Sequence, residues 1–338
     1  MSLKMIGRRL LAALPNLFGV LLLTFVMSRA LPGDPAAYFA GPSATAESVQ
    51  EVREKLGLDG PVMQQFVVYL GDLAEGDLGT SFNTGQPVLE DLMNRLPASM
   101  ELTLFALLLA VVVGMPLGIW AATKPGSLVD HTCRGLTTMS AAFPGFFVGL
   151  LLVFVFYYHL GWAPQPIGRL EIFYIAPPTI TGMYVIDAML VGDWEVARAA
   201  FGQLILPGIS LGLFALAPIA RMTRASMIGV LSSDFVRTAR ANGLSTGQVL
   251  VTYALRNALL PVVNILGMIF SFLLGANVLI EQVFGWPGIG RYAVEAVITS
   301  DYAAIQGFVV TMAIIYVLLN LFVDVLNTIV DPRVRYEG

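Results

Sequence analysis

Long apolar runs without charge alternate with short charged segments along the chain. Six runs are each long enough to contain a helix of about 20 residues, the length that crosses a bilayer core. These runs lie between Arg9 and Arg29, Glu101 and Lys124, Arg134 and Arg169, Arg198 and Arg221, Arg256 and Glu281, and Asp301 and Asp324. Their hydrophobicity does not alternate as in barrel strands, and backbone groups in lipid must be satisfied internally. The pattern predicts an all-α polytopic membrane protein with six transmembrane helices.

A seventh apolar segment, residues 172–186, is shorter and contains Pro177 and Pro178. Both its length and its prolines favour a re-entrant or interfacial piece of an external loop over a further span. Six spans place both chain termini on the same side of the membrane.

The basic residues are distributed unevenly between the two sides of the predicted spans. Of the 19 Lys and Arg residues, 12 fall on the side of the termini and 7 on the other, and 4 of those 7 lie in the single long segment 29–95. Cytoplasmic loops carry the excess of Lys and Arg, and the rule applies best to short loops. We therefore expect both termini, the loop 124–134 and the polar segment 232–261 to be cytoplasmic.

The same topology leaves three external segments. The largest is predicted to hold amphipathic helices at 46–56 and 63–73, and the others are 163–198 and 284–300. We therefore divide the chain into a cytoplasmic N-terminus with the first span (1–30), an external helical region (31–97), a membrane core (98–330) and a cytoplasmic tail (331–338). The core includes the polar segment 232–261 and the external loop 163–198.

Composition limits the chemistry that the chain can perform. The chain has 57% hydrophobic and only 12% charged residues, a composition that excludes a soluble protein. The single cysteine, Cys133, excludes an internal disulfide, and the only two histidines, His131 and His159, form no HExxH zinc motif. No lysine follows a glycine, so no Walker A loop is present. Gly208, Ser210 and Gly212 match the GxSxG string of hydrolases, but within an apolar span this spacing favours helix packing.

The polar segment 232–261 is predicted to form two short helices that meet at a turn. Ser233 or Asp234 is suited to cap the first helix, and Gly243 to end it with a positive φ. Ser245 and Gln248 have the spacing of a capping box for the second helix. The simpler interpretation is a basic loop attracted to anionic lipid headgroups. Lipid attraction requires no fixed helix–turn–helix, so the caps favour a protein partner.

Polar residues also occur within and beside the last two predicted spans. Because such groups are costly in a bilayer, they favour either a hydrated path or hydrogen bonds between helices. Helix contacts are the better explanation for any single residue, whereas their clustering favours a path for the set. The candidates for the path are Asn264, Ser271, Asn277, Glu281, Gln306 and Asn320.

Several motifs together resemble one known family. Residues 234–244 read DFVRTARANGL and residues 254–261 ALRNALLP; further motifs are PGDP at 32–35, GDLGTS at 76–81, FGWPGIG at 284–290 and DPR at 331–333. Across nearly the whole chain, these motifs are similar to the permeases of binding-protein-dependent ABC importers, closest to the dipeptide, oligopeptide and nickel branch. The chain departs from the wider superfamily in two places: residues 237–239 stand where the superfamily has Glu-Ala-Ala, and Arg256 stands where it has proline.

The resemblance implies a type I importer permease of a bacterial inner membrane. Its partners would be a second permease, two cytosolic subunits that bind ATP and Mg, a periplasmic solute-binding protein and membrane lipid, with no nucleic acid. The chain itself would be non-catalytic and bind no cofactor. The contacts to the ATPase would come from Asp234, Phe235, Arg237, Thr238, Ala239, Arg240, Gly243 and Leu244.

The cargo implied by the resemblance is a di- or oligopeptide, with nickel, glutathione-like peptides and glycosides as alternatives. A secondary transporter is the main rival class, but it is expected to carry ionisable residues in mid-span or repeated halves. Every predicted mid-span stretch lacks charge. An intramembrane hydrolase is the other rival class, but the GxSxG string in this chain lacks the histidine partner that such an enzyme requires.

Overall fold

The computed structural model describes residues 3–30, 35–40, 44–55, 57 and 59–330. Over these residues the secondary structure is helical, apart from one isolated β-bridge between Thr80 and Pro87. The helices are α1 (Leu3–Ala30), α2 (Pro35–Ala40), α3 (Ala46–Lys55), α4 (Val62–Glu75), α5 (Val88–Thr123), α6 (Leu128–Ala142), α7 (Gly145–Leu152), the π-helix η1 (Val153–His159), α8 (Tyr184–Leu190), α9 (Trp194–Leu231), α10 (Asp234–Ala241), α11 (Thr246–Gln248), the π-helix η2 (Val249–Leu255), α12 (Arg256–Val283), α13 (Ile289–Thr299) and α14 (Tyr302–Val330).

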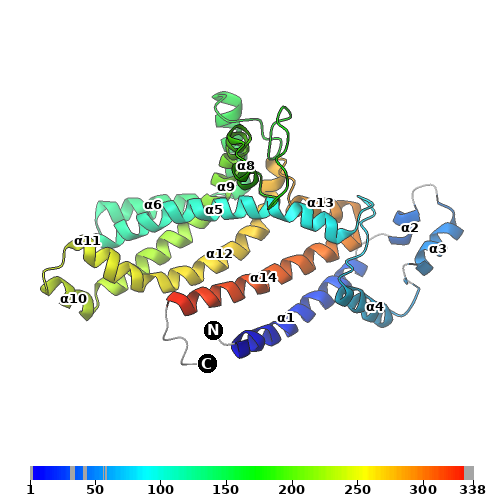
Figure 1. Ribbon diagram of the computed structural model, residues 1–338, viewed down its shortest axis with the longest axis horizontal. Coiled ribbons are helices and arrows are strands. Elements are labelled where there is room, and N and C mark those ends of the chain that lie inside the picture. The colour runs from blue at the N-terminus through cyan, green and yellow to red at the C-terminus, as the bar shows by residue number, and fades with distance from the viewer. Residues whose placement is uncertain (1–2, 31–34, 41–43, 56, 58, 331–338) are drawn as a thin grey trace.

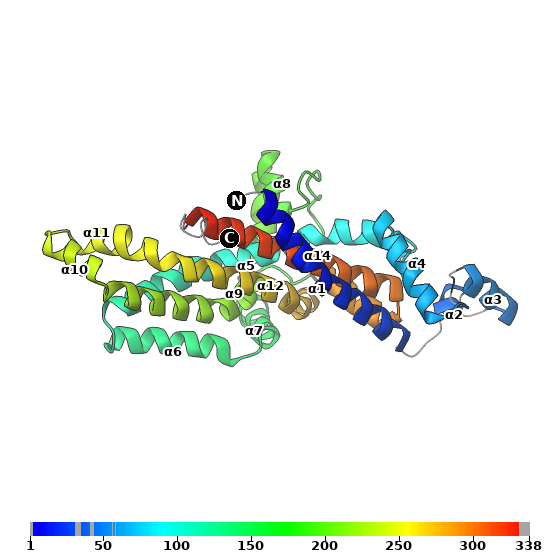
Figure 2. The same ribbon diagram turned by 90° about the horizontal axis from the view of Figure 1, so that it is seen from below.

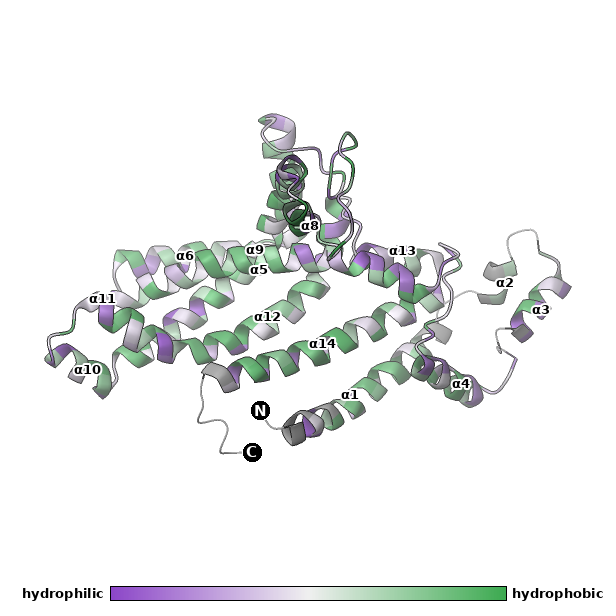
Figure 3. Cartoon of the chain, in the orientation of Figure 1, coloured by the Kyte–Doolittle hydropathy of each residue, from purple (hydrophilic) through white to green (hydrophobic). Residues whose placement is uncertain are grey.

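Five long helices, α1, α5, α9, α12 and α14, run along the length of the molecule (Figures 1 and 2). The short helices α10 and α11 lie at one end, whereas α13 and α2–α4 lie at the other. Apolar residues dominate the long helices, and hydrophilic residues are frequent at α10, α3, α4 and α13 (Figure 3). The expected all-α membrane architecture is therefore confirmed.

The number of spans depends on how the third predicted span is counted. Within the described residues, five helices are long and apolar enough to cross a membrane. The helix pair 128–140 and 145–159 makes a sixth span only if its 92° bend is accepted within one span. The bend has a local cause: Pro144 disfavours helical backbone at the preceding Phe143, which is extended with φ −109° and ψ 142°. The span predicted between Arg134 and Arg169 is therefore bent in the structure, because α6 begins at Leu128 and ends at this break, and α7 and η1 continue from Gly145.

Close approach of α5 and α9 forms the centre of the bundle. A Cβ atom on Gly208 would lie 2.2 Å from the Phe105 ring, and one on Gly212 would lie 3.0 Å from the Ala106 carbonyl oxygen. Side chains of α5, α9 and α12 form the largest buried apolar cluster around this contact, including Leu102, Leu211 and Leu273. The prediction that the GxSxG string is a packing face is confirmed.

The helix boundaries refine several other expectations. The predicted amphipathic helices are present as α3 and α4, although Leu56 lies outside the described residues. Residues 172–186 contribute to no candidate span, as expected, and end in the short helix α8. Helix α5 begins at Val88, so the expected boundary between residues 97 and 98 falls inside it. The predicted tail, residues 331–338, and the residues 32–34 of the PGDP motif lie outside the described part of the chain.

Candidate functional site

The polar element at one end of the bundle, residues 232–248, contains α10 and α11; we call it the docking element (Figure 1). Ser233 occupies the N-cap position of α10 with extended backbone, φ −74° and ψ 154°. Its hydroxyl donates to the Val230 carbonyl at 2.6 Å and makes no side-chain cap bond to α10. The predicted side-chain cap at this helix is therefore wrong, because the hydroxyl bonds back to the last turn of α9, at a carbonyl that also accepts from the Ser233 N–H at 3.1 Å.

Gly243 ends α10 as predicted. Its φ of +81° lies in the left-handed region, where a side chain is strained. The Gly243 N–H donates to the Arg240 carbonyl at 3.0 Å and the Leu244 N–H to the Ala239 carbonyl at 3.3 Å. These two bonds are those of a Schellman motif, and Leu244 completes it by packing on Val236 and Ala239.

Ser245 and Gln248 form the predicted capping box. The Gln248 side chain accepts from the Ser245 N–H at 3.1 Å, and the Ser245 hydroxyl accepts from the Gln248 N–H at 3.4 Å. The second helix is not short, however, because α11 continues through η2 into α12 as one helical segment from Thr246 to Val283. The docking element is therefore joined directly to a span.

The inner face of the docking element is attached to the bundle by apolar contacts. Val236, Ala239 and Val249 are buried together, and Val230 and Leu231 of α9 pack against them. The same two α9 residues also pack against a second cluster, formed by Ala122, Met227, Ala254 and Ala258. Helices α5, α9, η2 and α12 are thus in contact with the docking element through one continuous apolar region.

The outer face of the docking element is exposed and polar. Of the eight predicted contact residues, Ala239 is buried, Leu244 is partly buried and Gly243 forms the turn; the exposed side chains are those of Asp234, Phe235, Arg237, Thr238 and Arg240. Asp234 and Arg237 approach within 3.3 Å, but their side chains are 92% and 78% exposed. Such an ion pair contributes little to stability, so these charges remain available.

The six predicted path residues do not gather around one cavity. Ser271 lines an apolar groove of about 650 Å³ between α1, α12 and α14, and it is the only one of the six among the residues lining that groove. Asn264 accepts a hydrogen bond from Asn327, and Asn320 donates to the Tyr316 carbonyl of its own helix. Gln306 is buried. The remaining two, Asn277 and Glu281, are buried in a polar network near the opposite end of the bundle.

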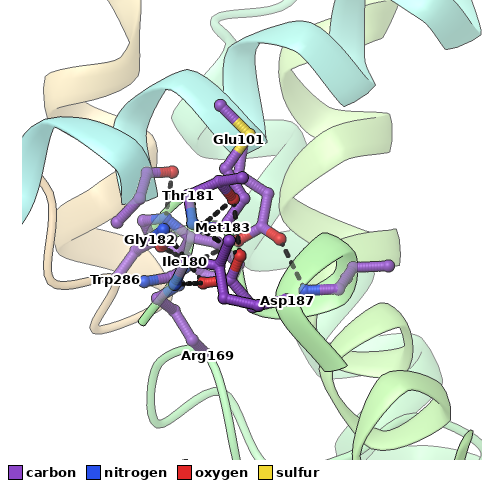
Figure 4. Close-up of polar contacts among 10 residues, drawn as sticks. Glu101, Arg169, Ile180, Thr181, Gly182, Met183, Asp187 and Trp286 are labelled. Carbon is purple, nitrogen blue, oxygen red and sulfur yellow. Dashed lines mark hydrogen bonds and ion pairs between the residues drawn. The ribbon is translucent and has the colours of Figure 1, made fainter. Parts of the chain in front are cut away.

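The first part of that network is a buried ion pair that joins the loop 163–198 to α5 (Figure 4). Arg169 donates to the Glu101 carboxylate at 2.6 Å and to the Gly182 carbonyl at 2.7 Å, and both charged side chains are 6% exposed. The Val185 N–H donates to the other Glu101 oxygen at 2.8 Å, and the Arg169 guanidinium lies 3.6 Å from the Tyr184 ring centroid. Sequence reasoning treated both charged residues only as span boundaries.

Asp187 organises the turn that this ion pair holds (Figure 4). Its carboxylate accepts from the backbone N–H groups of Ile180, Thr181 and Gly182 and from the Thr181 hydroxyl, at 2.7 to 3.2 Å. Burial by itself raises the pKa of Asp187, but the hydrogen bonds from Thr181, Ile180 and Gly182 together outweigh it and hold the pKa below its usual value. Residues 180–187 of the loop are therefore held in one conformation by hydrogen bonds.

The second part of the network surrounds Glu281 of α12. The Ser99 hydroxyl donates to Glu281 at 2.5 Å, and the Asn277 amide donates to the Ser99 carbonyl at 3.2 Å. Trp286, also buried, donates its indole N–H to the Ala98 carbonyl at 2.9 Å. These contacts attach α12 and the turn 284–290 to α5. Across the described residues, no group of three or more His, Cys, Asp or Glu side chains is arranged to hold a metal ion.

Comparison with known proteins identifies the family. The model of the binding-protein-dependent transport system inner membrane component matches residues 114–336, and the model of the N-terminal part of such membrane components matches residues 2–103. The chain therefore belongs to the family of inner-membrane components of binding-protein-dependent transport systems, as its motifs predicted.

Relatives of assigned activity match over nearly their whole length. A dipeptide transport system permease of Alkalihalophilus pseudofirmus is 41% identical, covering 97% of this chain and 98% of the relative. A probable D,D-dipeptide permease of Escherichia coli is 43% identical over 95% of this chain and 94% of the relative. A glutathione transport system permease of Escherichia coli is 37% identical over 99% of this chain and the whole of the relative.

A solved structure supports the fold. An inward-facing methionine ABC transporter superposes with a TM-score of 0.52 and 17% identity, covering 69% of this chain and 93% of the matched chain. The chain is thus an inner-membrane permease subunit with the fold of ABC importer membrane components.

Proposed function

We propose that this permease moves di- or oligopeptides inward across the bacterial inner membrane, driven by ATP hydrolysis in partner subunits. Near full-length similarity to dipeptide permeases supports the cargo. The observation that carries the mechanism is the exposed docking element, whose second helix is continuous with the span α12. The chain binds no nucleotide itself, and two cytosolic subunits bind ATP and Mg.

The remaining partners follow from the import mechanism. A second homologous permease completes the membrane part, and a periplasmic solute-binding protein delivers the peptide. The buried base of the loop 163–198 supports an external surface that keeps its shape during such delivery. Glutathione is the first alternative cargo, because one relative of 37% identity is named for it.

The docking element couples the ATPase to the spans. Its exposed residues, Asp234, Phe235, Arg237, Thr238 and Arg240, contact a groove of an ATP-binding subunit, while Ala239, Gly243 and Leu244 fix the angle of the turn. Closure of the ATPase pair moves this element, and the apolar contacts at Val230 and Leu231 pass the motion to α9 and α12. The ATPase pair must bind the two permease states with different affinity, since otherwise nothing shifts.

The translocation path lies along α12 and α14. Asn264, Ser271, Gln306 and Asn320 are proposed to meet the substrate or water when the bundle opens, with Ser271 at the groove beside α1. Asn277 and Glu281 belong to the same set, and they support the path from buried positions.

We place the docking element and both termini in the cytoplasm and keep the division of the chain at residues 30, 97 and 330. The contact of α1 with α14, including an ion pair between Arg9 and Asp324, supports termini on one side. In a Cys133→Ala background, a cysteine at Asp59 is expected to react with a membrane-impermeant thiol reagent in spheroplasts. A cysteine at Ser245 is expected to react only in inverted vesicles, and the reverse pattern contradicts this orientation.

Reconstitution with the partner subunits tests the function. Uptake of labelled dipeptide is expected to require ATP and to stop when the P-loop lysine of the ATPase is replaced. Arg240→Glu is expected to reach the membrane at normal level yet lose copurified ATPase, whereas Arg95→Glu, on the opposite end of the bundle, retains it. Uptake that persists without the lysine and follows a proton or sodium gradient contradicts the importer and favours a secondary transporter.

A further inference from the structure

The outer helix α13 has no side-chain cap of its own. Its N-cap residue is Gly288, so the first N–H groups of α13 depend on other helices. Ser99 of α5 accepts from the Ile289 N–H at 2.9 Å, and Glu281 of α12 accepts from the Arg291 N–H at 2.8 Å. The Ser99 hydroxyl in turn donates to Glu281 at 2.5 Å. Two membrane helices therefore cap a third helix through two side chains, which we call the Ser99–Glu281 clamp.

The clamp has no room for another group. A Cβ atom on Gly288 would lie 2.2 Å from the Glu281 carboxylate and 2.3 Å from the Ser99 hydroxyl. Glu281 is fully buried. The tight turn before α13 is thus closed around the carboxylate, and no described substrate groove reaches it.

The electrostatic partner of Glu281 is the helix terminus rather than a cation. The Arg291 side chain donates instead to Glu295 at 2.9 Å and to the Gly285 carbonyl at 3.4 Å. A carboxylate is favoured at a helix N-terminus, where unpaired N–H groups and the helix dipole are positive. Separating α13 from Glu281 would leave this buried carboxyl group with fewer hydrogen-bond donors, which is costly. The contact therefore resists gradual loosening.

We propose that the Ser99–Glu281 clamp makes α13 a rigid extension of α12, so that the outer helix moves as one body with the docking element during transport. Glu281 is then a positioning residue for transport. The proposal rests on the proposed function of the docking element. Its physical basis is independent, because α11, η2 and α12 form one helical segment that ends two residues after Glu281.

Distance measurements test this rigidity directly. In a Cys133→Ala background, spin labels are placed at Ala241 of α10 and Ile298 of α13, which are both exposed and lie outside the proposed ATPase contacts. We expect one narrow distance distribution that is the same without nucleotide and with ATP bound to the complete transporter. A shift larger than about 5 Å, one helical turn, would overturn the proposal.

Variants of the clamp provide the second test. Glu281→Gln puts an amide donor against existing donors, so the distance distribution is expected to broaden and substrate-stimulated ATP hydrolysis to fall severalfold. The matched control Glu295→Gln changes a partly exposed acid on α13 and is expected to change neither. Ser99→Ala keeps the Glu281 carboxylate and is expected to change both measurements in the same direction. It replaces Glu281→Gln as the test if that variant does not fold.

These outcomes separate the clamp from the docking role. A distribution that stays narrow in both Glu281→Gln and Ser99→Ala contradicts the clamp, even if the ATPase still copurifies. If the ATPase does not copurify with the unmodified chain, the docking role is contradicted. The clamp is then tested by the width of the spin-label distance distribution in the isolated permease.

Discussion

The docking element lies toward one end of the long helices. The buried polar contacts of Glu101, Arg169, Asp187, Ser99 and Glu281, which we call the outer network, lie toward the other end. Both regions are rich in polar groups. The docking element is held by hydrogen bonds between close neighbours, as in the Schellman motif at Gly243 and the capping box at Ser245. The outer network joins residues that are far apart in sequence, with 68 positions between Arg169 and Glu101 and 182 between Ser99 and Glu281. One region is a locally folded, exposed surface, which we propose binds the ATPase, and the other holds separate helices together.

Exposure separates the energetics of the two regions. The Asp234–Arg237 pair is in water, whereas the Glu101–Arg169 pair is almost fully buried. Water screens an exposed pair, but loss of one member of a buried pair leaves an uncompensated charge. Substitutions in the outer network should therefore affect stability most, and substitutions in the docking element should affect coupling most.

The largest effect is expected for Arg169→Met. It leaves Glu101 buried without its cation, which costs about 3–5 kcal/mol of stability. Thermal unfolding and limited proteolysis of the loop 163–198 measure this loss. The matched control is Arg237→Met in the docking element. Equal destabilisation by both variants would contradict the proposal that the buried ion pair contributes more to stability than the exposed one.

A smaller, local effect is expected for Gly243→Val. A side chain at this left-handed position costs about 1–2 kcal/mol of backbone strain. A Cβ atom there meets nothing else within 4 Å, so the strain comes from the residue's own backbone and not from a neighbouring element. We expect normal membrane abundance with reduced ATPase binding and uptake, measured by copurification and transport assay. Gly243→Asn, which tolerates positive φ better, should retain most activity; equal loss in both variants would argue against the turn as the cause.

Asp187→Asn tests how the stability of the loop 163–198 depends on pH. Because the pKa of Asp187 is lowered in the folded loop, its stabilisation is complete above the unfolded value of about 3.9 and is lost as pH falls through the folded value. Hydrogen exchange at the amides of residues 180–182 should accelerate relative to its intrinsic rate in this acid range. Asp187→Asn should exchange faster at neutral pH and lose the acid dependence. An unchanged acid dependence would assign it to another group.

The smallest effect is expected for Asp234→Asn. Its ion pair with Arg237 is exposed, so the change in stability should be at most about 1 kcal/mol. Binding to the ATP-binding subunits should still weaken if this face is a contact surface. Unchanged binding together with unchanged stability would remove Asp234 from the proposed interface.

The sequence by itself determined the features that depend on neighbouring residues. Apolar runs gave the spans, the helices α3 and α4 followed from their amphipathic patterns, and Gly243 with Ser245 and Gln248 defined the turn of the docking element. Each depends on backbone conformation or hydrogen bonds within one or two turns. The bend at Pro144 is also local, and its X-Pro signal was present in the sequence.

Only the tertiary structure decided which distant polar groups meet. The sequence marked Glu281 only as a polar residue beside a span and did not mark Ser99, and their contact exists because α5 and α12 pack closely enough to enclose the start of α13. Likewise, the local pattern marked Ser233 as a cap, but the end of α9 supplied a competing carbonyl. A local motif is stabilised by its own few residues, whereas a buried polar contact forms only when the packing of whole helices excludes water and aligns both partners.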